Sequence, residues 1–297
     1  MHDYALVLNA GSSSLKFCVY GRLEVEDWRL ESRGQIEGIG TSPRIRARDV
    51  AGRVLIDQKL EAKVVDGSNA LERLAAWLRF RYGDEQLVGV GHHVVHGGTR
   101  HPGPTVVTPQ VLAELYRLVP LAPLHQPYNL AAIEAVSEWF PDVPQVACFD
   151  TSFHWSQPRV AKLVPLPRDT CGSEVRRYGF HGLSYEYVAS VLPRIAFEIA
   201  AGRVIVAHLG SGASLCALKD CKSVDCSLGF TAPDGLCMGT RPGSVDPGVT
   251  LYLFQSLGLS PKEVETILYS KSGLLAISGI SNMTCAIFSQ AASRRAV

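Results

Sequence analysis

The sequence lacks several features that would direct it to a membrane or to nucleic acid. Its apolar stretches are too short to span a bilayer, and its start, Met1-His2-Asp3-Tyr4, has no basic region of the kind that opens a signal peptide. It also lacks an excess of charge, because 29 Lys and Arg residues oppose 28 Asp and Glu residues and leave a net charge of +1. We therefore expect no signal peptide, no membrane partner and no nucleic-acid partner.

The eight cysteines form no C-x-x-C pair. They are Cys18, Cys148, Cys171, Cys216, Cys221, Cys226, Cys237 and Cys285. Three of them stand five residues apart, at 216, 221 and 226, which is not a usual zinc spacing. We interpret the cysteines as small core residues in a reducing compartment, with the cytoplasm as the expected location and a metal or redox role as the alternative.

What the chain does contain is enough apolar sequence for two α/β domains. It has 297 residues, of which 46% are hydrophobic. The expected strands are residues 5–8, 15–20, 87–95, 144–149, 204–208 and 214–218. The expected helices run from Ser68 to near Gly83, from Thr108-Pro109, from near Leu130 to Phe140, from Ser184, and from the capping box Ser260-Pro261-Lys262-Glu263.

Two strand–turn–strand units occur, one early in each half. The first turn is Asn9-Ala10-Gly11-Ser12-Ser13-Ser14, and the second is Leu209-Gly210-Ser211-Gly212-Ala213. Ser14-Leu15 and Ser214-Leu215 occupy equivalent places in this weak repeat, at an offset of 200 (214 − 14). The repeat predicts two related domains, residues 1–150 and 151–297, facing a cleft.

Both turns consist of small residues, which let backbone N–H groups approach a phosphate closely. Two such turns could hold a phosphate chain from both sides, although a turn of this kind taken alone is more often an ordinary hairpin tip. Neither G-x-x-x-x-G-K-[ST] nor G-x-G-x-x-G is present, so the P-loop and the Rossmann dinucleotide site are excluded.

A longer set of motifs, in order along the chain, resembles the acetate and propionate kinase family. From the N-terminus, the matching segments are 8–17, 91–98, 123–127, 149–154, 177–182, His208 to Ser214, Thr231 through Arg241 to Pro247, and 272–281. The resemblance implies an α/β chain with the actin-like ATPase fold of the acetate and sugar kinases, made of two duplicated domains around a cleft. It implies an ATP-dependent, reversible phosphorylation of acetate to acetyl phosphate, with propionate or butyrate as the alternative substrate.

The same resemblance implies roles for particular residues. Asp150, His181 and Arg241 would be catalytic, His125 would support them, and Asn9 would help to hold Mg²⁺. The nucleotide would be bound by Lys16, Ser12, Ser14, His208, Leu209, Gly210, Ser211 and Gly212. The family commonly forms dimers, so a homodimer is possible.

Each of these residues also has a structural interpretation. Asp150 could cap the turn that follows its strand, and Arg241 could be a surface ion-pair partner. His181 and His208 could be hydrogen-bonded core histidines. A metal site at His92, His93 and His96 is a further alternative, but a strand places His92 and His96 on one face and His93 on the other.

The chain departs from the family pattern at one substrate position. In the family, arginine stands at position x of Gly91-His92-x-Val94-Val95-His96 and binds the substrate carboxylate. This chain has His93 at that position. Guanidinium offers a bidentate fork and a fixed charge, whereas an ordinary imidazole is charged only below about pH 6.5. We therefore expect His93 to bind a carboxylate more weakly, or to favour another acyl substrate.

The resemblance also fades after Ser281, so that roughly a quarter of a full-length family chain, including its adenosine-binding loop, is expected to be missing. The second domain would then be incomplete, with an exposed sheet edge and apolar faces. This predicts poor solubility or weak ATP binding, and it leaves a folded relic without catalysis as an alternative to an active kinase.

Overall fold

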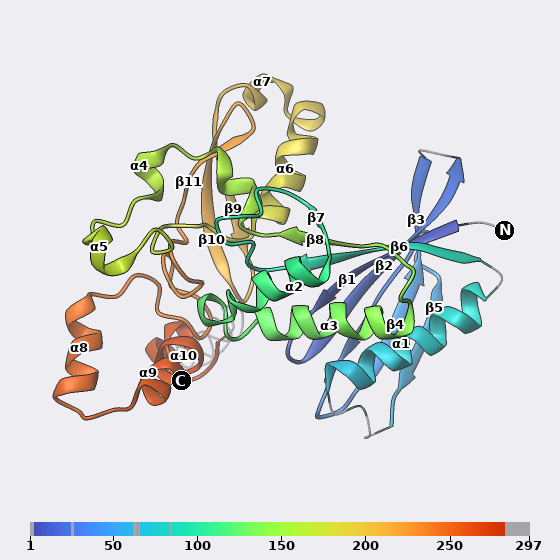
Figure 1. Cartoon of the computed structure of the whole chain (residues 1–297), viewed down its shortest axis with the longest axis horizontal. Helices are drawn as coiled ribbons and strands as arrows, with labels where there is room; N and C mark the ends of the chain where they lie inside the picture. Colours follow the sequence, from blue (N-terminus) through green and yellow to red (C-terminus); the bar gives the residue numbers. More distant parts are fainter. Residues whose placement is uncertain (1–2, 25–26, 62–63, 65, 84, 283–297) are drawn as a thin grey trace, which may run out of the picture. The chain divides into compact units, whose positions relative to one another are not determined.

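The structure is a computed structural model, which describes residues 3–24, 27–61, 64, 66–83 and 85–282. The chain forms two compact units, residues 1–152 and residues 153–297. Figure 1 shows the course of the chain from blue at the N-terminus to red toward the C-terminus. Each unit is described by itself below.

The first unit is built on an eight-stranded sheet with the order β5-β4-β3-β2-β1-β6-β8-β7. Its strands are β1 (Asp3–Ala10), β2 (Ser14–Glu24), β3 (Asp27–Glu37), β4 (Arg44–Asp49), β5 (Val54–Lys59), β6 (Gln86–Val94), β7 (Thr105–Val106) and β8 (Gln145–Phe149). The strands β1 to β5 form an antiparallel meander, whereas β1, β6 and β8 run parallel. Parallel pairing places the carboxyl ends of β1, β6 and β8 at one edge, where ligands bind in open α/β sheets.

Within its described residues, this unit has the α-helices α1 (Gly67–Tyr82), α2 (Pro109–Tyr116) and α3 (Gln126–Trp139), and a 3-10 helix at Val119–Leu121. The apolar side of α1, with Leu71, Leu74 and Leu78, lies in the same core cluster as residues of β1 and β2. The predicted start of α1 at Ser68 is wrong, because the side chain of Asp66 accepts a hydrogen bond from the Asn69 N–H (2.9 Å) and caps the helix instead. The predicted start of α2 after Thr108, with Pro109 at the first position, is confirmed.

The second unit contains a three-stranded antiparallel sheet with the order β11-β10-β9. These strands are β9 (Arg203–Leu209), β10 (Ala213–Lys219) and β11 (Lys222–Cys226). The surrounding helices are α4 (Arg159–Lys162), α5 (Arg168–Cys171), α6 (Gly182–Ile195), α7 (Phe197–Ala200), α8 (Pro247–Gln255), α9 (Pro261–Thr266) and α10 (Gly273–Ser278).

The sequence predicted the starts of two helices in this unit, and one of the two predictions is confirmed. The capping box of Ser260 and Glu263 is present, and it opens α9 as predicted. The predicted start of α6 at Ser184 is wrong, because the helix begins at Gly182 with His181 as its N-cap residue. His181 has φ of 60°, a left-handed conformation that is uncommon for a residue with a side chain.

The two predicted hairpins are present, but their strand registers differ. In the first, Ala10 pairs with Leu15, so Ser14, the first residue of β2, has no partner in β1. In the second, Leu209 pairs with Ala213 and His208 pairs with Ser214, so Ser214 lies inside the strand pair. The proposed equivalence of Ser14 and Ser214 is therefore wrong, because the second tip is shorter than the first.

The edge strand β9 exposes apolar side chains. Ile205 is 74% exposed and Leu209 is 75% exposed, and β9 is the last strand of its sheet in the part of the chain that the structure describes. An unpaired edge with apolar side chains is a template for association. Within the described ranges, no helix is both long enough and apolar enough to cross a membrane.

Candidate active site

Three predicted site residues lie at the carboxyl ends of the neighbouring parallel strands. Asn9 is the penultimate residue of β1, His93 is the penultimate residue of β6, and Asp150 follows β8 directly. The β1–β6 and β6–β8 ladders join these ends side by side. The sheet therefore brings an amide, an imidazole and a carboxylate to one edge of the first unit.

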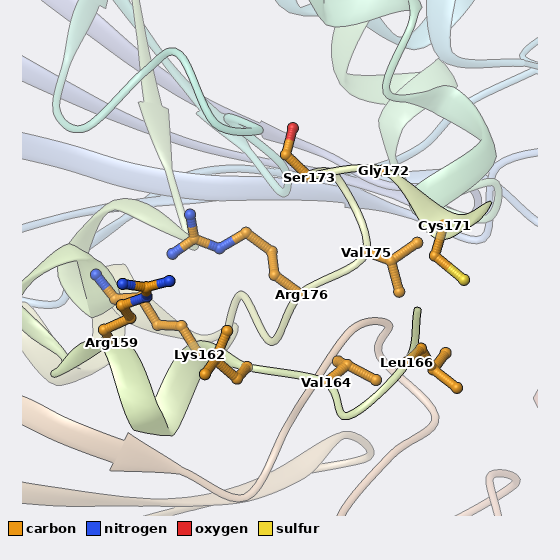
Figure 2. A pocket seen from close by; sticks show the side chains of 10 residues that line it. Arg159, Lys162, Val164, Leu166, Cys171, Gly172, Ser173, Val175 and Arg176 are labelled. Atoms are coloured by element: carbon orange, nitrogen blue, oxygen red, sulfur yellow. The ribbon is translucent and has the colours of Figure 1, made fainter. Parts of the chain in front are cut away.

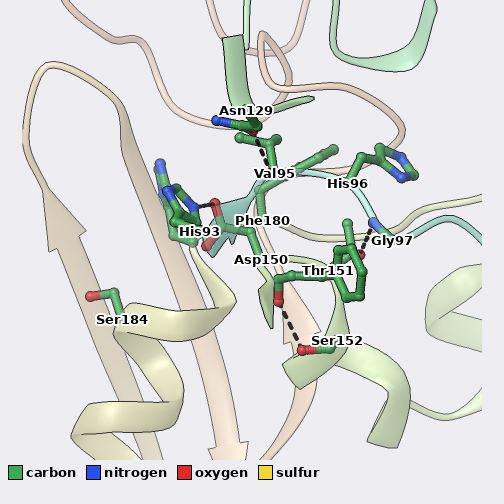
Figure 3. A network of polar contacts seen from close by, with 12 residues as sticks. His93, Val95, His96, Gly97, Asn129, Asp150, Thr151, Ser152, Phe180 and Ser184 are labelled. Atoms are coloured by element: carbon green, nitrogen blue, oxygen red, sulfur yellow. Dashed lines mark hydrogen bonds and ion pairs between the residues drawn. The ribbon is translucent and has the colours of Figure 1, made fainter. Parts of the chain in front are cut away.

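His93 and Asp150 form an ion pair at this edge. Nε2 of His93 lies 2.9 Å from Oδ2 of Asp150, as Figure 3 shows. Burial acts to lower the pKa of His93, but the charge of the Asp150 carboxylate and the hydrogen bond to it together raise that pKa above its ordinary value. The charged form of His93 therefore persists to a higher pH than the sequence predicted.

Two amides of α3 hold the backbone beside this pair. Oδ1 of Asn129 accepts from the Val95 N–H (3.0 Å), and its Nδ2 donates to the Ala10 carbonyl (2.8 Å), so this side chain ties the segments that follow β6 and β1. Gln126 pairs with both backbone groups of His96, at 3.1 and 3.0 Å. The predicted supporting residue His125 is half-buried and occupies the N-cap position of α3.

The first small-residue turn follows β1 and carries Ser12 and Ser14. The Gly11 N–H donates to the Ser14 carbonyl (2.9 Å), which closes the turn. Lys16 stands opposite Asn9 in the β1–β2 register, and both side chains are exposed. They line a hollow of about 420 Å³ together with Arg33, Arg46 and Arg48. Arg46 is paired with Glu37 and Asp57, whereas Lys16, Arg33 and Arg48 form no ion pair among the described residues and could attract a phosphate.

In the second unit, His181 is held by the buried hydroxyl of Ser214. Nδ1 of His181 lies 2.7 Å from Oγ of Ser214, which also hydrogen-bonds to the hydroxyl of Tyr185. His181 and Tyr185 are four residues apart at the start of α6, so both reach the same side of the helix. With Nδ1 bonded to Ser214, Nε2 is the nitrogen that His181 presents to a ligand.

His208 packs directly on His181. Their rings stack with centroids 4.1 Å apart, and Nδ1 of His208 lies 3.0 Å from Oγ of Ser184. Leu209, Gly210 and Ser211 follow in the exposed tip of the hairpin. The stack places the β9–β10 turn against the N-terminus of α6.

Gly212 lies in front of His181 and Arg241. A Cβ built at Gly212 would lie 2.6 Å from Nη2 of Arg241 and 3.3 Å from Nε2 of His181. Glycine leaves this space open, so the tip of the turn, the imidazole and the guanidinium surround one small volume. Three hydrogen-bond donors around one volume can bind the oxygens of a phosphoryl group.

The loop that carries Arg241 is fixed by its backbone. Nη1 of Arg241 donates to the Ala232 carbonyl (2.9 Å), and the Met238 N–H donates to the Arg241 carbonyl (2.9 Å). Gly273, with φ of 68°, passes so close to this loop that any side chain would collide with Met238 and Arg241. Burial lowers the pKa of Arg241 and Tyr269 opposes that shift, but a guanidinium remains charged at neutral pH. Within the described residues Arg241 makes no ion pair, which argues against its interpretation as a surface salt-bridge residue.

The other two histidines of the β6 segment point elsewhere. Nε2 of His92 lies 2.7 Å from Oε1 of Gln145, and Nδ1 of His96 accepts from the Gly98 N–H (2.9 Å). Burial lowers the pKa of each to about 4. Among the described residues, no three His, Cys, Asp or Glu side chains gather as a metal-binding group.

The cysteines in the described part of the chain are free thiols. Cys216 and Cys226 are buried in the second unit, and burial raises the pKa of Cys216 to about 12. Cys237 is exposed, so its interpretation as a core residue is wrong. Cys285 lies outside the described residues.

Comparison with known proteins gives the family. The model of the Acetokinase family matches residues 4–296. The chain belongs to the acetokinase family. The predicted family is thereby confirmed, and the solved structures described below confirm the predicted actin-like kinase fold.

Acetokinase relatives match this chain over most of its length. An acetate kinase of Rhodopseudomonas palustris is 47% identical over 95% of this chain and 71% of its own length. An acetate kinase of Nitrobacter hamburgensis is 49% identical over 94% of this chain and 69% of its own length.

Solved acetokinase structures share the fold. A propionate kinase of Francisella tularensis has a TM-score of 0.87 at 35% identity, over 98% of this chain and 74% of its own. An acetate kinase of Porphyromonas gingivalis has a TM-score of 0.80 at 34% identity, over 98% of this chain and 73% of its own.

The family model matches this chain as far as residue 296. The prediction that the resemblance fades after Ser281 is therefore wrong. Residues 283–297 themselves lie outside the described residues.

The acetokinase motifs did not show how the site residues are held, although Ser214 belongs to one of the matching segments. Ser214 and Tyr185 hold His181, Ser184 holds His208, and Asn129 ties β1 to β6. Helical spacing offered one signal, because Ser184 and Tyr185 follow His181 by three and four residues. Asn129 and its partners are far apart in the sequence, so nothing local indicated that contact.

Proposed function

We propose that this chain catalyses the reversible transfer of the γ-phosphoryl group of ATP to a short carboxylate, with acetate as the first substrate to test. One observation carries the proposal: the space in front of Gly212 is bounded by Nε2 of His181 and Nη2 of Arg241 in a chain of the acetokinase family. Several relatives carry the name acetate kinase.

The second unit would stabilise the phosphoryl group during transfer. A carboxylate oxygen attacks the γ-phosphorus, the bond from that phosphorus to the bridging oxygen breaks, and ADP leaves with the electron pair. No proton needs to move, so positioning and charge neutralisation supply most of the catalysis. Arg241 and His181 donate to the equatorial oxygens, and the turn from His208 to Gly212 contacts the nucleotide phosphates.

The first unit would bind the carboxylate substrate. His93 would supply the positive charge at the strand edge when protonated, and Asp150 both orients its ring and raises its pKa. A cationic imidazole donates a charge-assisted hydrogen bond to a carboxylate, although it lacks the bidentate fork of arginine. Lys16, Ser12 and Ser14 would bind nucleotide phosphates at the neighbouring turn.

A Mg²⁺ ion fits this reaction through Asn9. Magnesium in kinases is held by one or two protein oxygens, with substrate phosphates and water completing an octahedron. The exposed Asn9 amide lies beside the cationic hollow of Lys16, where nucleotide phosphates would bring the remaining oxygens. When bound, the ion neutralises charge on the β- and γ-phosphates.

Propionate is the second candidate substrate. The similarity to a propionate kinase of Francisella tularensis favours it, and His93 leaves more room than an arginine would. A homodimer stays a prediction of the resemblance, and a cytoplasmic location stays a prediction from the unpaired cysteines.

The test is acyl-phosphate formation by the purified chain with Mg-ATP and acetate, trapped as the hydroxamate, with propionate and butyrate in parallel. We expect product above the level of a His181→Ala control, which removes one proposed donor. Absence of product from folded protein would contradict the proposal and support a non-catalytic relic. Phosphate release that does not depend on an acyl acceptor would indicate an ATPase instead.

A further inference from the structure

A cavity of about 610 Å³ lies in the second unit, formed by α4 and the loop that leads from it to Tyr178. The loop closes on itself, because the Arg177 N–H donates to the Lys162 carbonyl (3.0 Å). None of the residues that line the cavity belongs to the candidate active site. Its size lies within the range of pockets that bind small organic molecules.

One end of the cavity is cationic. Arg159, Lys162 and Arg176 all line it, and Figure 2 shows their side chains gathered at the same end. Nζ of Lys162 donates to the Trp155 carbonyl (2.6 Å). The Nε atom of Arg176 is buried and has no hydrogen-bond partner among the described residues.

No acidic side chain in the described part of the chain forms an ion pair with these three cations. Glu174 belongs to the same loop, but its carboxylate accepts from the hydroxyl of Tyr178 (3.2 Å). Burial and, second, the charge of Arg176 lower the pKa of Lys162. Gathered cations of this kind repel one another, so an anion at this end would be stabilising.

The other end of the cavity is apolar. Val164, Leu166 and Val175 line it, and Figure 2 shows them on the opposite side from the guanidinium groups. Leu166 is 51% exposed. Exposed apolar surface next to a cationic end suits a ligand that has both an apolar part and an anionic group.

We propose that this cavity binds a small organic anion, whose phosphate or carboxylate group contacts Arg159, Lys162 and Arg176 while its apolar body packs on Val164, Leu166 and Val175. The site is separate from the proposed phosphoryl transfer and does not depend on it. Its ligand would be larger than acetate, because the apolar end requires a body of several carbons to fill it.

Calorimetric titration of the full chain with three probes tests this assignment. Hexyl phosphate carries both parts of the ligand, inorganic phosphate only the head, and hexanol only the body. We expect hexyl phosphate to bind at least tenfold more tightly than either part. Heptanoate in place of hexyl phosphate distinguishes a carboxylate head from a phosphate head.

Variants locate the binding. Lys162→Met with Arg176→Met keeps the apolar stems and removes two charges, and we expect a loss of at least tenfold in hexyl phosphate affinity. Arg194→Met, at an exposed arginine of α6 in the same unit, is the matched control and should leave the affinity unchanged. Equal affinity in the double variant, or an equal loss in the control, would overturn the proposal.

Protection of a cysteine from alkylation tests the site in the unaltered chain, in case the double variant does not fold. The same measurement distinguishes binding in the cavity from binding at the active site. Cys171 lines the cavity, so hexyl phosphate should slow its alkylation by N-ethylmaleimide several-fold, as followed by mass spectrometry. The exposed Cys237 is the internal control and should react at the same rate with and without the probe. Unprotected Cys171 at a saturating probe concentration would refute the site.

Discussion

Nε2 of His93 lies 2.9 Å from Oδ2 of Asp150, so the residue that departs from the family pattern is paired with the carboxylate that the pattern predicts to be catalytic. The pair joins the ends of the parallel strands β6 and β8. A neutral histidine would be a poor substitute for an arginine, but the carboxylate of Asp150 raises the pKa of His93 above its ordinary value and so favours the charged form.

Binding of acetate should therefore depend on pH through His93. The pKa of His93 is raised in the folded chain, so its imidazole is protonated, and its pairing with Asp150 stabilises the fold fully, below about pH 6.5. Both the charge and that stability are lost as the pH rises through the pKa of His93 in the folded chain. We expect the KM for acetate to increase across that range. His93→Arg should lower the KM by about tenfold and abolish the increase, since one charge-assisted hydrogen bond is comparable to a tenfold change.

The measurement is the KM for acetate between pH 6 and pH 9 in the unaltered chain and in His93→Arg, with His93→Gln as the neutral control. His93→Gln should raise the KM and show no such increase with pH. An unchanged KM in His93→Arg would show that His93 does not contact the carboxylate.

Gly212→Ala should nearly abolish phosphoryl transfer. The new methyl group would lie 2.6 Å from Nη2 of Arg241 and would occupy the space in front of His181. Loss of donors to a developing charge costs on the order of 10²–10³ in kcat. Gly103→Ala is the control, because a Cβ there meets nothing within 4 Å. Steady-state kinetics decide, and a kcat within twofold of the unaltered chain would mean that the phosphoryl group binds elsewhere.

Ser214→Ala should lower both stability and kcat. Its hydroxyl is fully buried and bonds both to Nδ1 of His181 and to the Tyr185 hydroxyl. Leaving buried partners unsatisfied costs about 1–3 kcal/mol in the free energy of unfolding. Urea denaturation gives that change, and kinetics should show a lower kcat with little change in the KM for ATP. Tyr185→Phe, which keeps Ser214 on His181, should lose stability while retaining most of the kcat; an equal loss of kcat in both variants would contradict the positioning role of Ser214.

Ile205→Lys should reduce aggregation of the purified chain. Ile205 is 74% exposed on the edge strand β9, and a lysine on an edge opposes pairing with another chain. Light scattering at increasing protein concentration measures the effect. Val54→Lys, at a residue 57% exposed on the edge strand β5 of the larger sheet, is the matched control. If both variants aggregate like the unaltered chain, β9 is not the surface through which it associates.

The sequence predicted the local structure well where the signals are themselves local. Short apolar runs on either side of small-residue turns gave the strands of both hairpins, Thr108-Pro109 gave the start of α2, and Ser260 with Glu263 gave the capping box. Local signals misplaced two helix starts, because the side chain of Asp66 caps α1 two residues before Ser68 and because His181, in a left-handed conformation, is the N-cap residue of α6.

By itself, the sequence determined the family, the α/β class and the residue types available for phosphoryl transfer, since these depend on the order of motifs along the chain. Only the tertiary structure decided how those residues are held. The His93–Asp150 pair, the Asn129 bridge and the opening at Gly212 each join residues that are distant in sequence. Such contacts depend on strand register and helix packing, and a shift of one residue in a strand register would break them. Local sequence patterns do not specify these contacts.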